Sequence, residues 1–279
     1  MTPSERSPRR KSPAQPPTIT LLTDFGGRDG FVGIVKGVLL RNCPEARLVD
    51  LSHDIAPQDV VGGALVLVSA VRHFPRHTVH LAVIDPGVGG PRRPIVVETP
   101  DFVLVGPDNG LLSLAAAGAP QWTFYHLDRR EYFLEHPSNT FHARDVFAPV
   151  AARIAAGVEP ARLGTRVDAI EELSLPAPRR VDRAIEGQVI YVDRFGNLVT
   201  NLQLEDLAAF RGEEVSVSIR GVQIAGISTH YSAVREGRPV VVWNSWGRLE
   251  VAICNGSAAR HLRARAGDRI EVTTREPRR

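Results

Sequence analysis

The chain has 279 residues, of which 43% are hydrophobic and 23% charged, a composition typical of a globular protein with a substantial core. No run approaches the roughly 18 to 20 apolar residues that a membrane-spanning helix needs, so we expect no membrane segment. The two cysteines, Cys43 and Cys254, stand in no Cys-x-x-Cys or Cys/His spacing. This indicates neither a disulfide framework nor a zinc site, and we expect a protein of the reducing cytoplasm.

The N-terminal residues 1–17 are basic and rich in proline and serine. They contain no apolar stretch of the kind that marks a secretory signal, so we expect a disordered tail. Four basic residues against one acidic residue give this tail the whole formal net charge of +3. The remaining chain is formally neutral, so that nucleic acid is not an expected partner despite a calculated pI of about 9.2.

From Ile19 onward, short apolar runs alternate with stretches of helical spacing. Strands are predicted over 19–25, 46–52, 78–85, 94–99 and 102–107, and helices over 29–42, 58–74 and about 145–156. Alternation of this kind is typical of an α/β layered domain. We predict an α/β N-terminal domain, residues 18–172, with a central, largely parallel sheet flanked by helices.

The pattern changes after residues 173–182, where two prolines and a charge cluster predict a linker. Beyond it, short strands with little helix between them are predicted for GQVIYVD, EEVSVSIRGVQIAGI, RPVVVWNS, LEVAI and DRIEVTT. We predict a smaller, all-β, barrel-like C-terminal domain over 183–275.

Polar residues follow three of the strands predicted for the N-terminal domain. Asp24 lies at the end of the first strand, with Asp29 just beyond it; Asp85 ends the strand over 78–85, and Asp108 and Asn109 follow the strand over 102–107. Ligands of open α/β sheets collect beyond the carboxyl ends of the strands. The glycines beside these residues permit tight turns and a close approach of the backbone to a ligand. We therefore predict a ligand site at this edge of the sheet.

Each of these signals also has a simpler interpretation, because an Asp before Gly or Pro after a strand is commonly a turn residue or a helix cap. The tripeptide DFG occurs in protein kinases, but the other kinase motifs are absent and the order is wrong. The sequence GGRDG alone is too short to indicate a phosphate-binding loop. From the residue pattern alone, the ligand of this site stays open.

Three further segments attract attention. His142 stands in TFHARD just before a predicted helix, where a lone histidine is usually a cap or a surface residue. In the second domain, DRFGN (193–197) and NSWG (244–247) interrupt strands with polar and aromatic residues. Both are also compatible with ordinary hairpin turns.

Seven ordered segments together resemble one family, the S-adenosylmethionine hydroxide adenosyltransferases, which are related to the enzymes that make 5′-halo-5′-deoxyadenosine. The segments are LLTDFGGRDGFVGIVKG, VDLSHDI, VIDPGVGGPRR, VGPDNGLL, TFHARDVFAPVAA, VDRFGNLVTNL and NSWGRLEVAICNGSAA, and they extend from Leu21 to Ala259. The resemblance implies hydrolysis of S-adenosyl-L-methionine to adenosine and L-methionine without a metal or other cofactor. It also implies a homotrimer with its sites at the subunit interfaces.

The resemblance implies a catalytic set of Asp85, Arg92 and His142, with the spacing Asp-x₆-Arg intact. Ala143 stands where relatives often have glycine. A positioned carboxylate or imidazole can accept a proton from water, and an arginine, always cationic, can orient the water and stabilise hydroxide. Which group takes the proton is left open by the sequence.

The resemblance also implies the substrate-binding residues. Asp24 would accept hydrogen bonds from the ribose diol, Asp193 would hold the methionine ammonium, and Ser245 would contact the methionine carboxylate. The further candidates are Phe195 and Trp246 for packing, Asn197 and Asn255 for the adenine edges, and Asp29, Asp108 and Asn109 beside the first domain's strand ends. In the halogen-transferring relatives an arginine follows the serine, whereas Trp246 follows it here.

Two alternatives remain beside hydrolysis. The first is halide transfer by the same fold; the halogen-transferring relatives lack the counterparts of Asp85 and His142, which are present here. The second is a non-catalytic sensor of S-adenosylmethionine or adenosine, for which a water-activating set would serve no purpose.

Overall fold

The computed structural model describes residues 16–210 and 213–274 and divides into two compact units, Met1–Glu172 and Leu173–Arg279. Most of the tail expected over residues 1–17 lies outside the described residues. Each unit has its own hydrophobic core. Among the described residues, no helix is long and apolar enough to cross a membrane.

The first unit is built around a mixed, seven-stranded sheet with the order β2-β1-β3-β5-β4-β6-β7. The strands are β1 (Thr18–Thr23), β2 (Arg47–Ser52), β3 (Thr78–Val83), β4 (Pro94–Glu98), β5 (Phe102–Pro107), β6 (Thr123–His126) and β7 (Thr165–Val167). Strands β2, β1, β3 and β5 are parallel, whereas β4, β6 and β7 pair antiparallel. The four parallel strands therefore direct their carboxyl ends toward one edge of the sheet.

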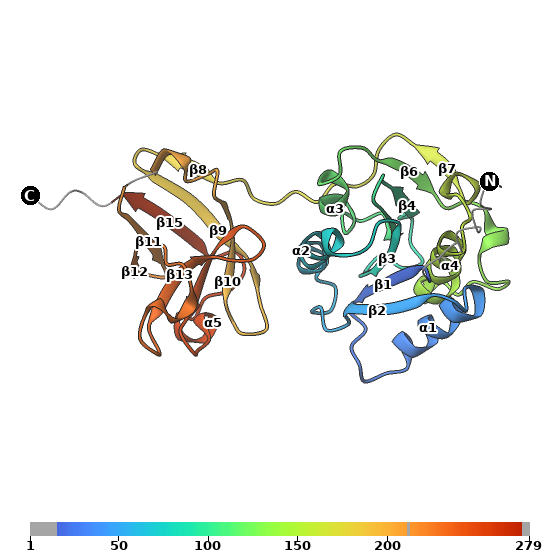
Figure 1. Ribbon diagram of the computed structural model, residues 1–279, viewed down its shortest axis with the longest axis horizontal. Coiled ribbons are helices and arrows are strands. Elements are labelled where there is room, and N and C mark those ends of the chain that lie inside the picture. Colours follow the sequence, from blue (N-terminus) through green and yellow to red (C-terminus); the bar gives the residue numbers. More distant parts are fainter. Residues whose placement is uncertain (1–15, 211–212, 275–279) are drawn as a thin grey trace, which may run out of the picture. The chain divides into compact units, whose positions relative to one another are not determined.

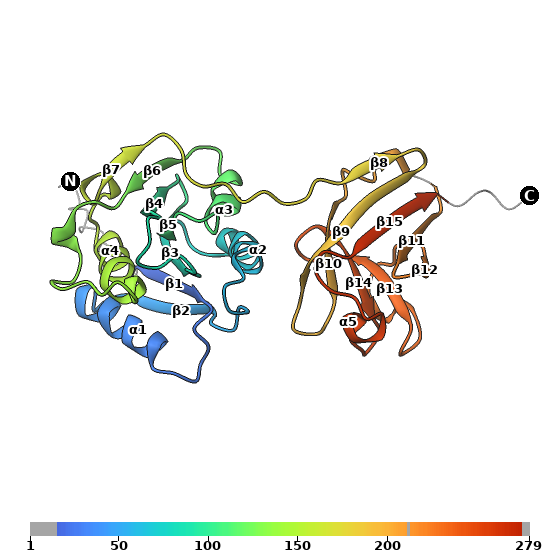
Figure 2. The same cartoon turned by 180° about the vertical axis from the view of Figure 1, so that it is seen from behind.

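Helices cover both faces of this sheet (Figures 1 and 2). On one face α1 (Phe31–Asn42) packs against α4 (Ala148–Ala155), and on the other α2 (Val60–Ala70) packs against α3 (Ser113–Ala117). A π-helical turn, η3 (Ala143–Phe147), leads directly into α4. Short 3₁₀ turns are η1 (Val71–His73), η2 (Arg130–Tyr132) and η4 (Pro160–Arg162). The Asp59 carboxylate caps α2 by accepting the Gly62 N–H at 2.8 Å.

The second unit is an antiparallel, barrel-like sheet with the strand order β12-β11-β15-β9-β10-β14-β13. Its strands are β8 (Arg179–Val181), β9 (Ala184–Val192), β10 (Leu198–Gln203), β11 (Val215–Ile219), β12 (Val222–Ala225), β13 (Pro239–Trp243), β14 (Arg248–Ile253) and β15 (Arg269–Thr274). The short helix α5 (Ala258–His261) and the turns η5 (Ala208–Phe210) and η6 (Tyr231–Ala233) connect them. An isolated bridge joins Ser228, just after β12, to Val242 of β13, so the two ends of the sheet approach each other.

The expected α/β unit followed by an all-β unit is confirmed. The expected helix over 145–156 is divided between the π-helical turn and α4. Residues 179–181 of the predicted linker form β8, which pairs with β9. Strands β6, β7 and β10 were not among the predicted elements.

Candidate functional site

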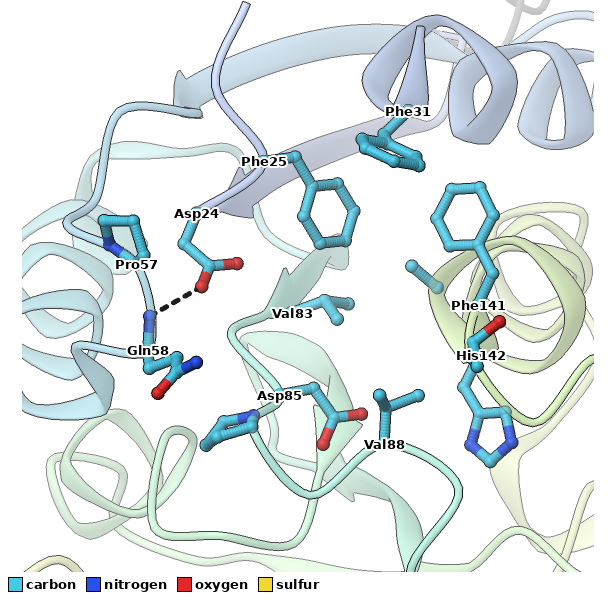
Figure 3. Close-up of a pocket in the computed structure, with 13 residues that line it drawn as sticks. Asp24, Phe25, Phe31, Pro57, Gln58, Val83, Asp85, Val88, Phe141 and His142 are labelled. Atoms are coloured by element: carbon cyan, nitrogen blue, oxygen red, sulfur yellow. Dashed lines mark hydrogen bonds between the residues drawn. The ribbon is translucent and has the colours of Figure 1, made fainter. Parts of the chain in front are cut away.

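A cavity of about 440 Å³ lies at the carboxyl ends of β1 and β3. Because these strands are parallel neighbours, the residues that follow them, Asp24 and Asp85, reach the same cavity. His142, from the segment before η3, lines it as well. Figure 3 shows Asp24 on one side, His142 on the other and Asp85 between them. The structure thus brings together three of the residues selected from the sequence.

Arg92 connects two of these side chains. Its Nε donates to Asp85 Oδ1 at 2.9 Å and a terminal nitrogen donates to Asp85 Oδ2, which makes a bidentate ion pair. The same terminal nitrogen lies 2.8 Å from His142 Nδ1. The Arg92 and Asp85 side chains are only 10% and 6% exposed, and the guanidinium lies 5.3 Å from the Phe147 ring centre. The three residues therefore form a single cluster, in which the Asp85 and Arg92 side chains are largely shielded from solvent.

The contact with Arg92 determines the protonation of His142. An arginine has no acceptor, so His142 Nδ1 must be unprotonated and must accept the hydrogen bond. Burial, and then the positive charge of Arg92, lower the pKa of His142, against the opposing effect of Asp85 and Asp145. The ring is therefore neutral at pH 7, and its proton lies on Nε2.

The segment that carries His142 is fixed by a buried carboxylate. Asp145, 1% exposed, accepts the Ser138 N–H at 2.7 Å and both Arg144 hydrogen bonds, at 2.5 and 2.9 Å. The Gly89 backbone, at φ +76°, packs so closely against the Asn139 carbonyl that a side chain would collide with it. The loop after Asp85 thus packs directly onto the loop before His142. Single π-helical turns such as η3 are rare and often occur at functional sites.

Asp24 is held by the turn that precedes α2. Its Oδ2 accepts the backbone N–H of Gln58 at 2.8 Å, drawn as the dashed line in Figure 3. Gln58 has φ +67°, a left-handed conformation that is costly for a residue other than glycine and that recurs at functional sites. The Asp24 carboxylate keeps further acceptor positions for a ligand.

Three aromatic rings line one side of this cavity and form a phenylalanine wall. Phe25, Phe31 and Phe141 meet edge to face, with ring centres 5.4 to 6.0 Å apart. Phe31 is 46% exposed although it is a large apolar side chain. Aromatic faces attract cations as well as apolar groups.

The other candidates of the first unit lie outside this cavity lining. Asp108, 4% exposed, forms an ion pair with Arg93 and accepts the Glu171 N–H at 2.7 Å. Asn109 donates to the Ile84 carbonyl at 2.9 Å, and its own side-chain oxygen accepts the Leu111 N–H. Asp29 is exposed just before α1. In these contacts Asp108 and Asn109 fix loops, as the simpler interpretation of such residues proposes.

The second unit has a cavity of about 770 Å³. It is lined by all six candidates selected there: Asp193, Phe195, Asn197, Ser245, Trp246 and Asn255. Asp193 accepts hydrogen bonds from the Phe195 and Asn197 N–H groups at 2.9 and 2.8 Å, and from Asn197 Nδ2 at 3.0 Å. Phe195 is 75% exposed. The structure thus gathers these residues around one open surface.

Sequence reasoning missed the buried acid beneath this cavity. Glu250, 3% exposed, accepts the Tyr231 hydroxyl at 2.8 Å and Asn244 Nδ2 at 2.9 Å. Burial raises the pKa of Glu250, and burial together with the hydrogen bond to Glu250 raises the pKa of Tyr231. The signal was a charged residue inside the apolar run LEVAI.

Within residues 16–210 and 213–274, no group of three or more His, Cys, Asp or Glu side chains is arranged to hold a metal ion. Both cysteines are buried and free.

Comparison with known proteins decides the family. The model of the SAM hydroxide adenosyltransferase N-terminal domain matches residues 19–164, and that of the C-terminal domain matches residues 187–271. The chain belongs to the SAM hydroxide adenosyltransferase family. It is 40% identical over 266 residues to the (R)-S-adenosyl-L-methionine hydrolase of Salinispora tropica, covering 93% of this chain and 99% of that protein.

A more distant relative is the fluorinase of Nocardia brasiliensis, 27% identical over 289 residues and covering 92% and 96% of the two chains. The crystal structure of an uncharacterized conserved protein from Thermotoga maritima matches with a TM-score of 0.85 at 34% identity, covering 91% of this chain and 99% of that one. The resemblance to the SAM hydroxide adenosyltransferases drawn from the sequence is therefore confirmed, together with the fold that it implied.

Proposed function

We propose that the protein hydrolyses S-adenosyl-L-methionine to adenosine and L-methionine. The observation that carries the proposal is the Asp85–Arg92–His142 cluster, whose Asp85 and His142 line one cavity with Asp24. The 40% identical relative named as a hydrolase supports it, since the relatives named as fluorinases are less similar.

In the proposed reaction, water attacks ribose C5′ from the side opposite to sulfur. The C5′–O bond forms as the C5′–S bond breaks, and the electron pair of that bond passes to sulfur, which leaves as the neutral thioether of methionine. A neutral thioether needs no general acid, so the protein has only to position the water and accept one proton.

Hydrogen bonding in the cluster favours Asp85 as the acceptor of that proton. The Nδ1 atom of His142 already accepts from Arg92, and Nε2 carries a proton, so His142 can donate but has no free acceptor. Asp85 keeps free lone pairs although both of its oxygens bind Arg92. His142 and Arg92 would then orient the water, and the fixed charge of Arg92 would stabilise hydroxide as it forms.

The substrate would lie with its ribose diol on Asp24. The sulfonium would face the phenylalanine wall, where cation–π attraction favours the positively charged substrate over the neutral product methionine. Asp193 and Ser245 would hold the amino acid part, and Asn197 and Asn255 the adenine edges, with Phe195 and Trp246 packing against the substrate.

We also propose a homotrimer in which one subunit's first-unit cavity and a neighbour's second-unit cavity share a substrate molecule. The division of the candidate residues between two open cavities supports this arrangement. The two free, buried thiols fit a cytoplasmic protein. Light scattering at micromolar concentration should give the mass of three chains, and a monomer would contradict the assembly.

The activity is tested by incubating the full-length protein with S-adenosylmethionine in ¹⁸O-labelled water, without added metal and with a chelator. Adenosine labelled at its 5′ oxygen and methionine should form in equal amounts. Unchanged substrate, or activity lost to the chelator, would contradict the proposal. Saturating chloride should yield no 5′-chloro nucleoside; a halogenated product would instead assign the protein to the halide-transferring branch.

A further inference from the structure

A chain of four polar side chains runs from the surface of the first unit to the turn that carries Asp24. Lys36 Nζ donates to Asp50 Oδ2 at 2.6 Å. His53 Nε2 lies 3.0 Å from Asp50 Oδ1, an electrostatic contact that is not aligned as a hydrogen bond. His53 Nδ1 lies 2.8 Å from Thr23 Oγ1. We call these four residues the support chain.

The inner end of the support chain contacts the turn after β1. The Thr23 hydroxyl oxygen accepts the Phe25 N–H at 3.3 Å, and the His53 carbonyl accepts the Gly26 N–H at 2.7 Å. Asp24 and Phe25, both on this turn, point into the cavity (Figure 3). The support chain therefore holds the turn through hydrogen bonds with Thr23 and with the His53 backbone.

For a neutral His53 ring, one arrangement of the hydrogens fits all of these contacts. If Thr23 donates its hydroxyl hydrogen to His53 Nδ1, its oxygen stays free to accept the Phe25 N–H. The His53 proton then lies on Nε2, facing the Asp50 carboxylate. Lys36 balances the charge of that carboxylate. In this arrangement the Thr23 hydroxyl acts as both donor and acceptor, and the Asp50 carboxylate contacts both Lys36 and His53.

We propose that His53 is a positioning residue, which acts through Thr23 to hold the Asp24 turn in its ligand-binding conformation. The hydrogen bond between Thr23 and His53 is buried at the Thr23 end, where the side chain is 2% exposed. If this hydrogen bond is lost, a water molecule cannot take its place at Thr23 without disturbing the turn. The consequence for turnover rests on the proposed function of Asp24 as the ribose acceptor.

The fold offers a matched comparison on the same strand. Thr20 of β1 forms the same contact with His80, from Oγ1 to Nδ1 at 2.8 Å. Thr20 is three residues from Thr23, and neither Thr20 nor His80 lines the cavity. Both pairs join a threonine of β1 to a histidine by the same contact. Only the Thr23–His53 pair adjoins the turn that carries Asp24.

Two substitutions separate the two contacts of His53. The amide oxygen of His53→Asn can replace Nδ1 as the acceptor for Thr23, whereas the amide nitrogen of His53→Gln can replace Nε2 beside Asp50. We expect His53→Gln to raise the KM for S-adenosylmethionine and the Kd for adenosine by about 3- to 10-fold, the loss of one buried hydrogen bond, with kcat changed less than about 2-fold. We expect His53→Asn to retain values close to those of the unmodified protein.

Hydrogen exchange gives a readout that does not need turnover. The Phe25 and Gly26 amides should exchange faster in His53→Gln and unchanged in His53→Asn. The comparison variant His80→Gln, which loses the contact with Thr20, should lower Tm while leaving KM and these two amides unchanged. A Tm measurement on each variant separates loss of folding from loss of positioning.

The proposal predicts a difference between the two His53 variants. It would be overturned if both had the KM and the exchange rates of the unmodified protein, or if KM rose equally in both. A loss of kcat that follows Tm, with KM unchanged, would assign His53 a purely structural role. If the unmodified protein leaves S-adenosylmethionine intact, the proposed function fails, and the exchange of Phe25 and Gly26 still decides the role of His53.

Discussion

Acid should destabilise the first unit through His80. This side chain is fully buried on β3, with its ring edge to face with Phe74 and Phe102, and its Nε2 has no partner among the described residues. Burial lowers the pKa of His80 from 6.5 to about 4. A protonated imidazole would place an uncompensated charge among aromatic rings, so the folded protein resists protonation.

The direction of this pH effect on stability depends on whether the folded or the unfolded state binds the proton. Between pH 6.5 and about 4 the unfolded chain protonates His80 and the folded chain does not, so the free energy of unfolding falls as the pH falls. The full difference between the two pKa values corresponds to about 3 kcal/mol in the free energy of unfolding. At pH 5 about 2 kcal/mol of it should already be lost, and above pH 7 the effect should vanish.

The assay compares the unmodified protein with His80→Asn, which does not titrate. Urea unfolding is measured from pH 7.5 to pH 5, with pulse-labelled hydrogen exchange in β1 and β3 to report on the first unit alone. The variant should be less stable at pH 7.5, because it leaves space in the core, but its stability should fall less with acid. Contributions from other titrating groups cancel in the difference between the two proteins. Parallel curves from pH 7.5 to pH 5 would refute the reasoning.

Three other predictions concern the cavities. Burial and the charge of Arg92 lower the pKa of His142, so the acid limb of the kcat/KM profile should lie below pH 6.5; a limb above that value would contradict the neutral ring. Gln58→Gly should raise the free energy of unfolding by about 1 kcal/mol in urea titrations, because glycine accepts φ +67° without strain, and equal or lower stability would argue against strain there. Glu250→Gln keeps the shape but replaces one acceptor oxygen with a donor, so either the Tyr231 hydroxyl or Asn244 loses its acceptor and calorimetry should show weaker methionine binding; unchanged affinity would make this acid irrelevant to the second cavity.

The parallel strands were the most predictable part of the fold. A strand buried on both faces has a nearly continuous apolar sequence, as β3 does, and this pattern is visible without a structure. The placement of Asp24 beside Asp85 follows from the same argument, because neighbouring parallel strands end at one edge. The order β5-β4-β6 was not predictable, since the sequence does not state where an antiparallel strand joins a sheet. The strands β6 and β7 are too short to give a periodic pattern.

The pairing of charges could not be derived from the sequence. Arg92 and Arg93 are adjacent, yet Arg92 pairs with Asp85 at the cavity and Arg93 pairs with Asp108 away from it. From the sequence, Asp85 and Asp108 look alike, each an Asp that follows a strand. Only the fold determines which of them lines the cavity. The resemblance to the family separated Asp85 from the others, and residue pattern alone did not.

A matched pair of substitutions should separate attack from binding. Asp24 and Asp85 follow adjacent parallel strands, and changing either to Asn removes the charge while keeping the shape. In Asp85→Asn the amide nitrogen cannot accept from Arg92, so the bidentate pair is lost and the water loses its proton acceptor. We expect kcat to fall by about 10²- to 10⁴-fold, the range for a positioned acid–base group, with adenosine still bound.

Asp24→Asn should have the opposite pattern. It keeps an oxygen for the Gln58 N–H but loses the charged acceptor for the ribose diol, so KM and the Kd for adenosine should rise by about 10-fold or more while kcat falls much less. Steady-state kinetics gives both constants, and calorimetry with adenosine gives binding without turnover. If both variants lose kcat and affinity to the same extent, the two carboxylates act as one unit, and the separate roles derived from their contacts are wrong.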